Sequence, residues 1–466
     1  MTDAPLILWF RRDLRLADHP MLAAAVATGR PLIPVFILDP ETDANGAAAK
    51  WRLGLSVGDF AAQLQRLGLR LVLRRGPALD VLTALIAESG AAGVMWSRLY
   101  DPVSQHRDAA VKAALKERGL IAQSFAGHVL FEPWSVQTGG GGFYKVYTPY
   151  WRAVRDRDVG PQLPAPSAAR APEVWPDSDT LPAWQLGAAM QRGAAIVLPY
   201  QRIGEAAALV RLADFVAGPV GPYQDRRDFM AEAASSGLSE NLTYGEISPR
   251  QVWHAGMRAR EASAAGAEHF LKEVAWREFA HHLVYHSPHM ITQAWRAEWE
   301  SFPWRADNDD AERWRRGMTG EPAVDAAMRQ MYVTGTMHNR ARMIAASYLT
   351  KHLLTDWRVG QAWFAECLTD WDPASNAMGW QWVAGSGPDA APYFRIFNPA
   401  TQAEKFDPNR SYRTRWLRPT SPEAESFFRA VPMAWGLDLF APYPQPVIKL
   451  EAGRARALAA LAQRKA

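Results

Sequence analysis

The chain has little cysteine, no long apolar runs and no large excess of charge of one sign. Its only cysteine is Cys367, which excludes an internal disulfide and a four-cysteine iron–sulfur cluster. The longest apolar runs, such as residues 32–38, are far too short to cross a bilayer. No export signal opens the chain, so we expect a reducing, cytoplasmic location and no membrane partner. A formal net charge of only +4 does not by itself indicate a nucleic-acid partner.

The first 130 residues alternate strand and helix patterns. The strand-like runs are 6–10, 32–38, 69–75 and 93–96, and the helix-like segments are 51–66, 78–88 and 105–118. This alternation predicts an α/β domain with a doubly wound parallel sheet. The loop after the first strand, residues 11–20, lacks the glycine fingerprint of a dinucleotide-binding turn.

The rest of the chain is predicted to be a connector followed by an all-helical domain. Six prolines between Pro161 and Pro182 indicate an irregular connector, although its aromatic stretch 143–151 should pack against a domain. Helix patterns cover 201–216, 248–264, 266–286, 321–333, 336–354, 359–369 and 450–464. We therefore expect an α/β domain at 1–131, a connector at 132–200 and a helical domain at 201–466.

Tryptophan is abundant in the helical part. The chain has 20 tryptophans, and thirteen lie after residue 250. Two of them, Trp380 and Trp382, fall in the run 376–407, which mixes aromatic residues with Gly, Pro, Asn and Asp. Such a mixture is typical of a cofactor pocket, where apolar walls carry a few fixed polar groups.

Helical spacing brings candidate side chains together on two segments. Glu273 shares a helix face with Trp276 and Arg277, and Asn339 shares one with Arg342 and Met343. Either pattern alone fits a salt-bridged helix surface equally well. The segment 235–239 supplies hydroxyls and amides that suit a phosphate, although serine-rich turns and helix caps look the same.

Seven motifs in order resemble those of the photolyase/cryptochrome family, and the chain looks most like a class I-type cyclobutane pyrimidine dimer (CPD) DNA photolyase. The motifs lie at 9–16, 144–152, 235–239, 276–279, 319–329, 337–343 and 376–407. The resemblance implies that 1–131 is an antenna domain and that 201–466 is the catalytic domain holding a U-shaped FAD. It implies light-driven repair of these dimers, a carbon–carbon lyase reaction.

The resemblance also implies the cofactor site. Phe270 stands where close relatives often have Trp, and Asn376 falls opposite flavin N5. A neutral amide there tolerates the anionic reduced flavin, whereas a carboxyl group would favour protonation of N5. Arg342 is expected to pair with Asp370. The implied FAD-binding residues are Tyr223, Ser235, Ser236, Gly237, Leu238, Ser239, Phe270, Arg342, Asp370, Trp371, Asp372 and Asn376.

The same resemblance implies an electron-transfer chain and a DNA-facing set. Trp380, Trp357 and Trp304 match the family's electron-hopping tryptophans, with Trp314 and Trp363 as possible substitutes. With Asn376 and Glu273 they are the expected catalytic residues, and no metal is expected. The implied DNA-binding residues are Arg227, Glu273, Trp276, Arg277, Asn339, Arg340, Met343, Trp382 and Gln402. The expected partner is UV-damaged DNA, single- or double-stranded, bound by a monomer.

An antenna chromophore and three other functions remain open. Family members with a folate antenna carry an Asn-Glu pair where this chain has 98–105, so a folate is doubtful and a deazaflavin or no antenna is equally open. A cryptochrome-type blue-light photoreceptor is the main alternative to repair. Repair of the (6-4) photoproduct is disfavoured because that subfamily has histidines at the positions of Asn339 and Met343. A flavin or adenine-nucleotide electron-transfer protein is the most remote possibility.

Overall fold

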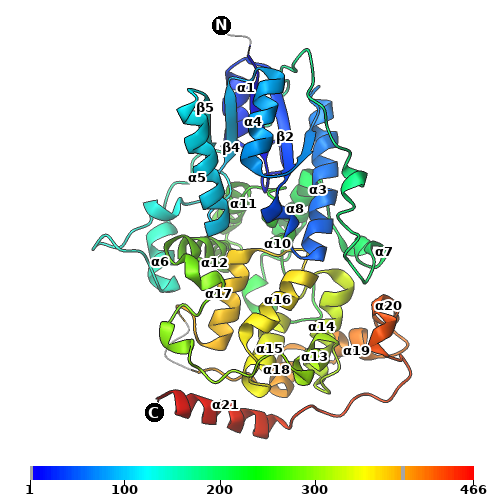
Figure 1. Ribbon diagram of the computed structural model, residues 1–466. Coiled ribbons are helices and arrows are strands. Elements are labelled where there is room, and N and C mark those ends of the chain that lie inside the picture. Colours follow the sequence, from blue (N-terminus) through cyan, green and yellow to red (C-terminus); the bar gives the residue numbers. More distant parts are fainter. Residues whose placement is uncertain (1–3, 390–393, 466) are drawn as a thin grey trace.

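A computed structural model of the chain describes residues 4–389 and 394–465. A parallel five-stranded sheet lies at one end of the molecule, and the helical part lies below it (Figure 1). The strand order is β3-β2-β1-β4-β5. The strands are β1 (Leu6–Phe10), β2 (Leu32–Leu38), β3 (Val72–Arg75), β4 (Gly93–Ser97) and β5 (Ile121–Phe125). The predicted fold class, a doubly wound α/β part followed by an all-helical part, is confirmed.

Helices cover both faces of the sheet, as parallel sheets require. Side chains from alternate positions of β1 pack with α1 and α3 on one face and with α4 and α5 on the other. Every residue of β2 is buried, which explains its uninterrupted apolar sequence. The helices are α1 (Pro20–Ala27), α2 (Pro40–Asp43), α3 (Ala47–Arg66), α4 (Ala78–Ser89) and α5 (Pro102–Glu117).

The segment after β5 runs along the surface of both parts, and the aromatic stretch in it is packed. Tyr147, Tyr150 and Trp151 are buried, as expected. Farther along, the backbone amide of Leu32 donates to Arg170 and that of Asp179 donates to Leu73, so the connector is docked on the sheet. Its short elements are η1 (Pro133–Ser135), α6 (Tyr147–Val154), η2 (Leu181–Trp184), α7 (Ala194–Val197) and η3 (Leu198–Tyr200).

Helices make up the remainder of the described chain. Within residues 4–389 and 394–465 no strand follows Phe125. The helices of eight or more residues are α8 (Gly204–Ala217), α11 (Pro249–Glu261), α12 (Ala267–His286), α14 (Pro322–Thr334), α15 (Asn339–Ser347), α16 (Trp357–Cys367), α17 (Pro373–Ala384), α18 (Pro399–Phe406), α20 (Pro422–Ala430) and α21 (Leu450–Lys465). Shorter elements are α9 (Tyr223–Arg226), α10 (Ser239–Thr243), η4 (Pro288–Ile291), η5 (Ala297–Trp299), α13 (Asp309–Arg315), α19 (Ser411–Leu417) and η7 (Met433–Trp435).

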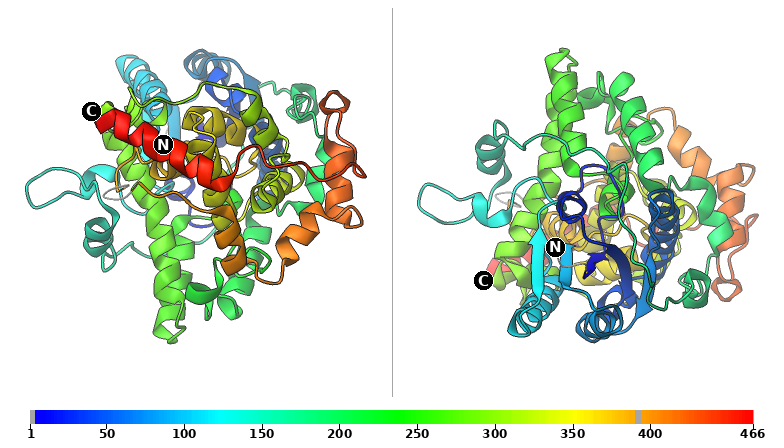
Figure 2. Two further views of the ribbon diagram at one scale, coloured as in Figure 1. Left: turned by 90° about the horizontal axis from the view of Figure 1, so that it is seen from below. Right: turned by 90° about the horizontal axis from the view of Figure 1, so that it is seen from above.

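Two further features of the helical part concern the end of α15 and the position of the last helix. The predicted helix 336–354 is α15 continued by a π-helical turn, η6 (Tyr348–His352). The final helix, α21, lies across the end of the molecule farthest from the sheet (Figures 1 and 2). No helix of the described residues is long and apolar enough to cross a membrane.

Candidate functional site

The short loop between α16 and α17 carries the first part of the site. Asp370 is buried, and its Oδ2 accepts a hydrogen bond of 2.7 Å from Nη2 of Arg342 on α15. This is the pairing expected from the sequence. The other carboxylate oxygen, Oδ1, is buried and has no partner among the described residues. A buried acceptor without a donor is costly, so this oxygen suits an N–H group of a bound molecule.

Asp372 and Asn376 define the start of α17. Asp372 is the N-cap, and its Oδ1 accepts from the Ser375 amide at 2.7 Å. The backbone carbonyl of Asp372 accepts from the Asn376 side-chain Nδ2 at 3.0 Å. The amide of Asn376 is therefore oriented, and its oxygen is left to face away from this bond. Trp380 follows one helical turn later on the same helix.

Two further segments contribute the aromatic and hydroxyl groups predicted for the cofactor site. Tyr223 and Phe270 are buried and pack with Phe215, at ring-centroid distances of 5.4 and 4.7 Å from it. Leu238 is buried, whereas Ser235, Gly237 and Ser239 are exposed and Ser236 and Trp371 are half-buried. Sequence reasoning missed Arg211, whose Nη1 donates to the carbonyl of Gly237.

The tryptophans expected in an electron-transfer chain lie on neighbouring elements. Trp380 and Trp357 are buried, and Trp304 is half-buried. The Trp380 ring packs directly on Gly360, where an added Cβ would come within 2.1 Å of it, three residues after Trp357. Arg305 follows Trp304. Its backbone amide donates to the Leu354 carbonyl, and its carbonyl accepts from the Asp356 amide. Trp304 therefore lies beside the segment that leads into α16. The ordering from buried to half-exposed side chains suits charge transfer towards the surface.

A strip of alternating charges joins α12 to α15. Glu273 on α12 pairs with Arg227, Arg227 lies 4.0 Å from Asp228, and Asp228 pairs with Arg340 on α15. Asp228 was missed by sequence reasoning because an isolated Asp beside two arginines has no periodic signal. We call Glu273, Arg227, Asp228 and Arg340 the charged strip.

The other residues of the predicted DNA-facing set are placed less uniformly. Trp276 stacks on Tyr147 with ring centroids 3.6 Å apart, so one face of its indole is covered. Trp382 is half-buried under the guanidinium of Arg395, at 4.9 Å. Arg277 does not pair with Glu273 in the described chain, because its guanidinium donates to the His128 carbonyl at 2.9 Å and to Glu278.

The remaining members of that set lie on α15 and α18. Asn339 begins α15, and its side-chain nitrogen lies 4.0 Å from the sulfur of Met343, one turn later. Gln402 on α18 has a buried side-chain oxygen without a partner among the described residues. Part of the run 376–407, residues 390–393, lies outside the described residues.

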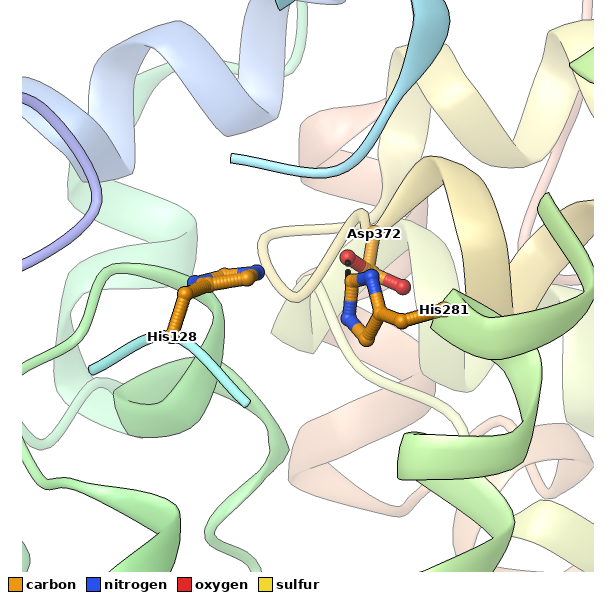
Figure 3. Close-up of side chains that lie close together, drawn as sticks. All are labelled: His128, His281 and Asp372. Carbon is orange, nitrogen blue, oxygen red and sulfur yellow. Dashed lines mark ion pairs between the residues drawn. The ribbon is translucent and has the colours of Figure 1, made fainter. Parts of the chain in front are cut away.

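A cluster of His128, His281 and Asp372 closes the site on the side of the sheet (Figure 3). One ligand-type atom from each lies within 4.8 Å of the others, and His281 Nε2 lies 3.6 Å from Asp372 Oδ2. Burial lowers the pKa of His281 to about 4, and the neighbouring His281 and Arg12 outweigh burial in lowering that of Asp372 to about 2.

Two guanidiniums make this cluster a poor cation site. Arg12 Nη1 lies 3.7 Å from Asp372 Oδ2, and Arg277 Nη2 lies 3.4 Å from His128 Nε2. A divalent ion bound between the three ligands would face both positive charges, so we assign no metal to it.

A cavity lies at the carboxyl edge of the sheet. It has a volume of about 470 Å³, and residues that follow β2, β3 and β4 line it. The lining is mainly apolar and includes Pro40, Pro77, Leu79, Pro102, Val103 and His106. Ligands of open α/β sheets bind at this edge. Nearby, Arg98 is not free for a ligand, because it pairs with Glu132 at 2.6 Å.

Comparisons with known proteins agree over the whole length. Residues 6–168 match the family model described as DNA photolyase, and residues 270–463 match the FAD binding domain of DNA photolyase. The chain is 45% identical to the deoxyribodipyrimidine photo-lyase of Agrobacterium fabrum, covering 99% of this chain and 98% of that protein. It is 32% identical to Cryptochrome-1 of Arabidopsis thaliana, covering 98% of this chain and 70% of that protein.

Solved structures of photolyases are also similar to this chain. A bacterial class III photolyase from Agrobacterium tumefaciens superposes with a TM-score of 0.92 at 44% identity, covering 100% of this chain and 98% of that one. An archaeal photolyase from Sulfolobus tokodaii with two FAD molecules superposes with a TM-score of 0.81 at 27% identity, covering 98% of this chain and 100% of that one.

Proposed function

The chain belongs to the DNA photolyase family, and we propose that it binds FAD and repairs cyclobutane pyrimidine dimers in DNA under light. The observation that carries the proposal is the loop before α17, where Arg342 pairs with Asp370 and the Asp372 carbonyl orients the Asn376 amide. The expected class I-type assignment stays a prediction, since the solved structure at 44% identity is named a class III photolyase.

The residues around the α16–α17 loop fit a flavin. The unpartnered Oδ1 of Asp370 would accept a hydrogen bond from a ring N–H of the flavin, and the hydrogen bond from Arg342 to Oδ2 orients this carboxylate. The Asn376 amide, held by the Asp372 carbonyl, would have its oxygen free to face flavin N5. Tyr223, Phe270 and Leu238 supply apolar walls, and the hydroxyls of 235–239 are assigned to the phosphates. When bound and reduced, FAD would supply the absorption of light and an electron for opening the cyclobutane ring, which is returned after the ring has split.

The charged strip and the neighbouring indoles are proposed to hold the damaged DNA. Arg227 and Arg340 are assigned to phosphates, and Glu273 accepts hydrogen bonds from pyrimidine N–H edges. Trp276 offers one indole face to a flipped base, because Tyr147 covers the other face. Trp382 lies on the helix of Asn376 and is assigned to the opposite wall. The remaining predicted DNA contacts are Asn339, Met343, Gln402 and, less directly, Arg277.

We also propose a second chromophore in the sheet cavity. Its support is the mainly apolar cavity at the carboxyl edge and the solved archaeal photolyase with two FAD molecules. Deazaflavin and folate both remain candidates, and extraction of the purified protein followed by mass spectrometry identifies the occupant. A monomer and a cytoplasmic location remain predictions.

The test of the main proposal is repair of a thymine-dimer oligonucleotide by purified protein. We expect the dimer to disappear under blue light and to persist in darkness. Persistence in both conditions, with FAD bound, would contradict repair. It would favour the blue-light photoreceptor function, for which the 32% identity to Cryptochrome-1 is the specific observation.

A further inference from the structure

Both oxygens of the Asp372 carboxylate face groups of the protein. Oδ1 accepts from the Ser375 amide at 2.7 Å, and the nearest charged neighbours of Oδ2 are His281 at 3.6 Å and Arg12 at 3.7 Å. Asp370, two residues earlier, keeps one oxygen without a partner. The two aspartates are therefore not equivalent, although the sequence predicts both as cofactor-binding residues.

Arg12 belongs to the sheet part of the molecule, in the loop that follows β1. That loop is docked on the helical part, because the Leu14 amide donates to the Tyr244 carbonyl at 3.1 Å. An added Cβ on Gly245 would lie 2.1 Å from the Arg12 carbonyl oxygen, so the two backbones are in direct contact. The backbone that carries the Arg12 guanidinium is thus held by contacts with the helical part.

The segment that bears the site is fixed at its other end through the same docking region. The hydroxyl of Tyr244 donates to the carbonyl of Thr369 at 2.5 Å and lies 3.2 Å from that of Ala49 in α3. Thr369 directly precedes Asp370. Residues 369–372 are therefore held at one end by Tyr244 and at the other by Arg12 and His281.

We propose that Asp372 is a positioning residue, whose contacts with Arg12 and His281 let the sheet domain fix the start of α17 and the Asn376 amide. The inference rests on the proposed function and deepens it. Arg12 lies beside the Asp372 carboxylate, and the Asp372 carbonyl accepts a hydrogen bond from Asn376 Nδ2. These two contacts link the position of Arg12 to that of the Asn376 amide. The antenna domain is then a structural part of the flavin site as well as a seat for a chromophore.

The test uses variants of the full-length holoenzyme. Asp372→Ser keeps a good N-cap but removes the carboxylate, and Arg12→Met removes the guanidinium while keeping an unbranched side chain. The matched control is Arg250→Met. Arg250 makes an ion pair of 3.1 Å with Asp18 in the same β1–α1 loop, but it does not touch residues 369–372 in the described chain.

We expect both site variants to bind FAD, to shift its absorption spectrum and to lower the repair kcat, with KM for dimer DNA unchanged. A displacement near 1 Å costs up to about 100-fold, and a partial shift of Asn376 should cost about 3- to 30-fold. The double variant should be no worse than the worse single variant, because both break one contact. Arg250→Met should leave spectrum and kcat unchanged.

Three outcomes would overturn the inference. Site variants that behave like Arg250→Met show that the contact positions nothing. Losses that multiply in the double variant show that the two residues act independently. Loss of FAD in Asp372→Ser but not in Arg12→Met shows that Asp372 contacts the cofactor directly. A wild-type protein without repair activity would overturn the proposed function instead, and the flavin spectrum would still report on positioning.

Discussion

Glu273 does two things at once in this structure, and its removal separates them. Its carboxylate neutralises Arg227 and is also the proposed acceptor for the lesion. We expect Glu273→Ala to weaken binding of dimer-containing DNA by about 1–3 kcal/mol. Binding of undamaged DNA should not fall, because the released Arg227 strengthens the non-specific attraction to phosphates.

The measurement for Glu273→Ala is the Kd for matched damaged and undamaged duplexes at one salt concentration. Glu268→Ala is the control, since Glu268 lies on the same helix and pairs with Lys272 at 2.7 Å, outside the charged strip. An unchanged preference for damaged DNA in Glu273→Ala would remove Glu273 from the lesion site.

Asn376→Asp should convert the flavin site to one that promotes proton uptake. Asn376 Nδ2 lies 3.0 Å from the Asp372 carbonyl oxygen, so an Asp would place an oxygen against an oxygen there. That contact favours the protonated carboxyl group, which supplies a proton, and the ionised form repels the anionic reduced flavin. We expect a changed absorption spectrum of the bound flavin under blue light and at least about a threefold loss of repair turnover, which corresponds to a barrier increase of at least about 0.6 kcal/mol.

Asn398→Asp is the control for Asn376→Asp. Asn398 is the N-cap of α18 and accepts from the Thr401 amide at 3.1 Å, a role that Asp fills equally well. Identical spectra and turnover in wild type and Asn376→Asp would mean that Asn376 does not face N5.

At the residue scale the family resemblance predicts a tertiary pair that the spacing of residues could not, because Arg342 and Asp370 lie 28 positions apart. The Arg342–Asp370 pairing was expected and is present. The contacts of Arg12 and His281 with Asp372 were not expected, because these residues lie far apart along the chain. The roles assigned to the predicted site residues stay predictions until they are measured.

Periodicity was a good guide to the elements. The predicted strands 6–10 and 32–38 have the observed bounds, and the predicted helix 266–286 is α12 to within one residue. The edge strand β5 was missed, because Ile121–Phe125 is short, polar in part and exposed. At η6 the sequence pattern predicts a continued α-helix, since a π-helical turn does not change a hydrophobic pattern.

The packing of α16 on α17 leads to a prediction for electron transfer. Trp380 and Trp357 lie on these helices, and Trp304 lies beside the entry to α16. We expect Trp304→Phe to slow light-driven reduction of oxidised FAD by about tenfold or more, because phenylalanine preserves packing but is far harder to oxidise. A tenfold change corresponds to about 1.4 kcal/mol in the barrier. Repair by chemically reduced enzyme should be unchanged.

Trp314→Phe distinguishes the alternative route. The Trp314 ring lies 6.2 Å from that of Trp380, but its side chain is fully buried, whereas the side chain of Trp304 is half-buried and reaches solvent. We therefore expect Trp314→Phe to leave photoreduction intact. If Trp314→Phe slows the reaction and Trp304→Phe does not, the chain runs through Trp314.

At the scale of the whole molecule, long-range contacts join segments that the sequence pattern treats separately. The β1–α1 loop is docked on Tyr244 and Gly245, and the connector follows the sheet. Another long-range contact lies near the end of the molecule that is farthest from the sheet. There the segment before α21 lies against the turn 319–321, with the Val447 amide donating to the Thr319 carbonyl at 2.8 Å.

That contact should make the attachment of the C-terminal segment depend on pH through Glu321. Burial, with the nearby Asp325 and Glu451, raises the pKa of Glu321 from 4.5 to about 7. A carboxyl group whose pKa is raised by folding stabilises the fold below its unfolded pKa, and that stabilisation is lost as the pH rises through the folded value. Stability should therefore fall between about pH 4.5 and pH 7 on account of this group.

Glu321→Gln keeps the shape of Glu321 and removes its charge. Near pH 8 we expect the variant to be more stable than wild type by about 1–2 kcal/mol, and near pH 5 the two should be equal. Thermal unfolding at the two pH values measures this. Glu312→Gln should behave oppositely, because ion pairs with Arg316 and Arg315 outweigh burial and lower the pKa of Glu312. Glu312→Gln should therefore lower the free energy of unfolding near pH 8. A stability difference for Glu321→Gln that is the same at both pH values would show that Glu321 does not ionise in this range, and the attachment of α21 would then have no carboxyl switch at this contact.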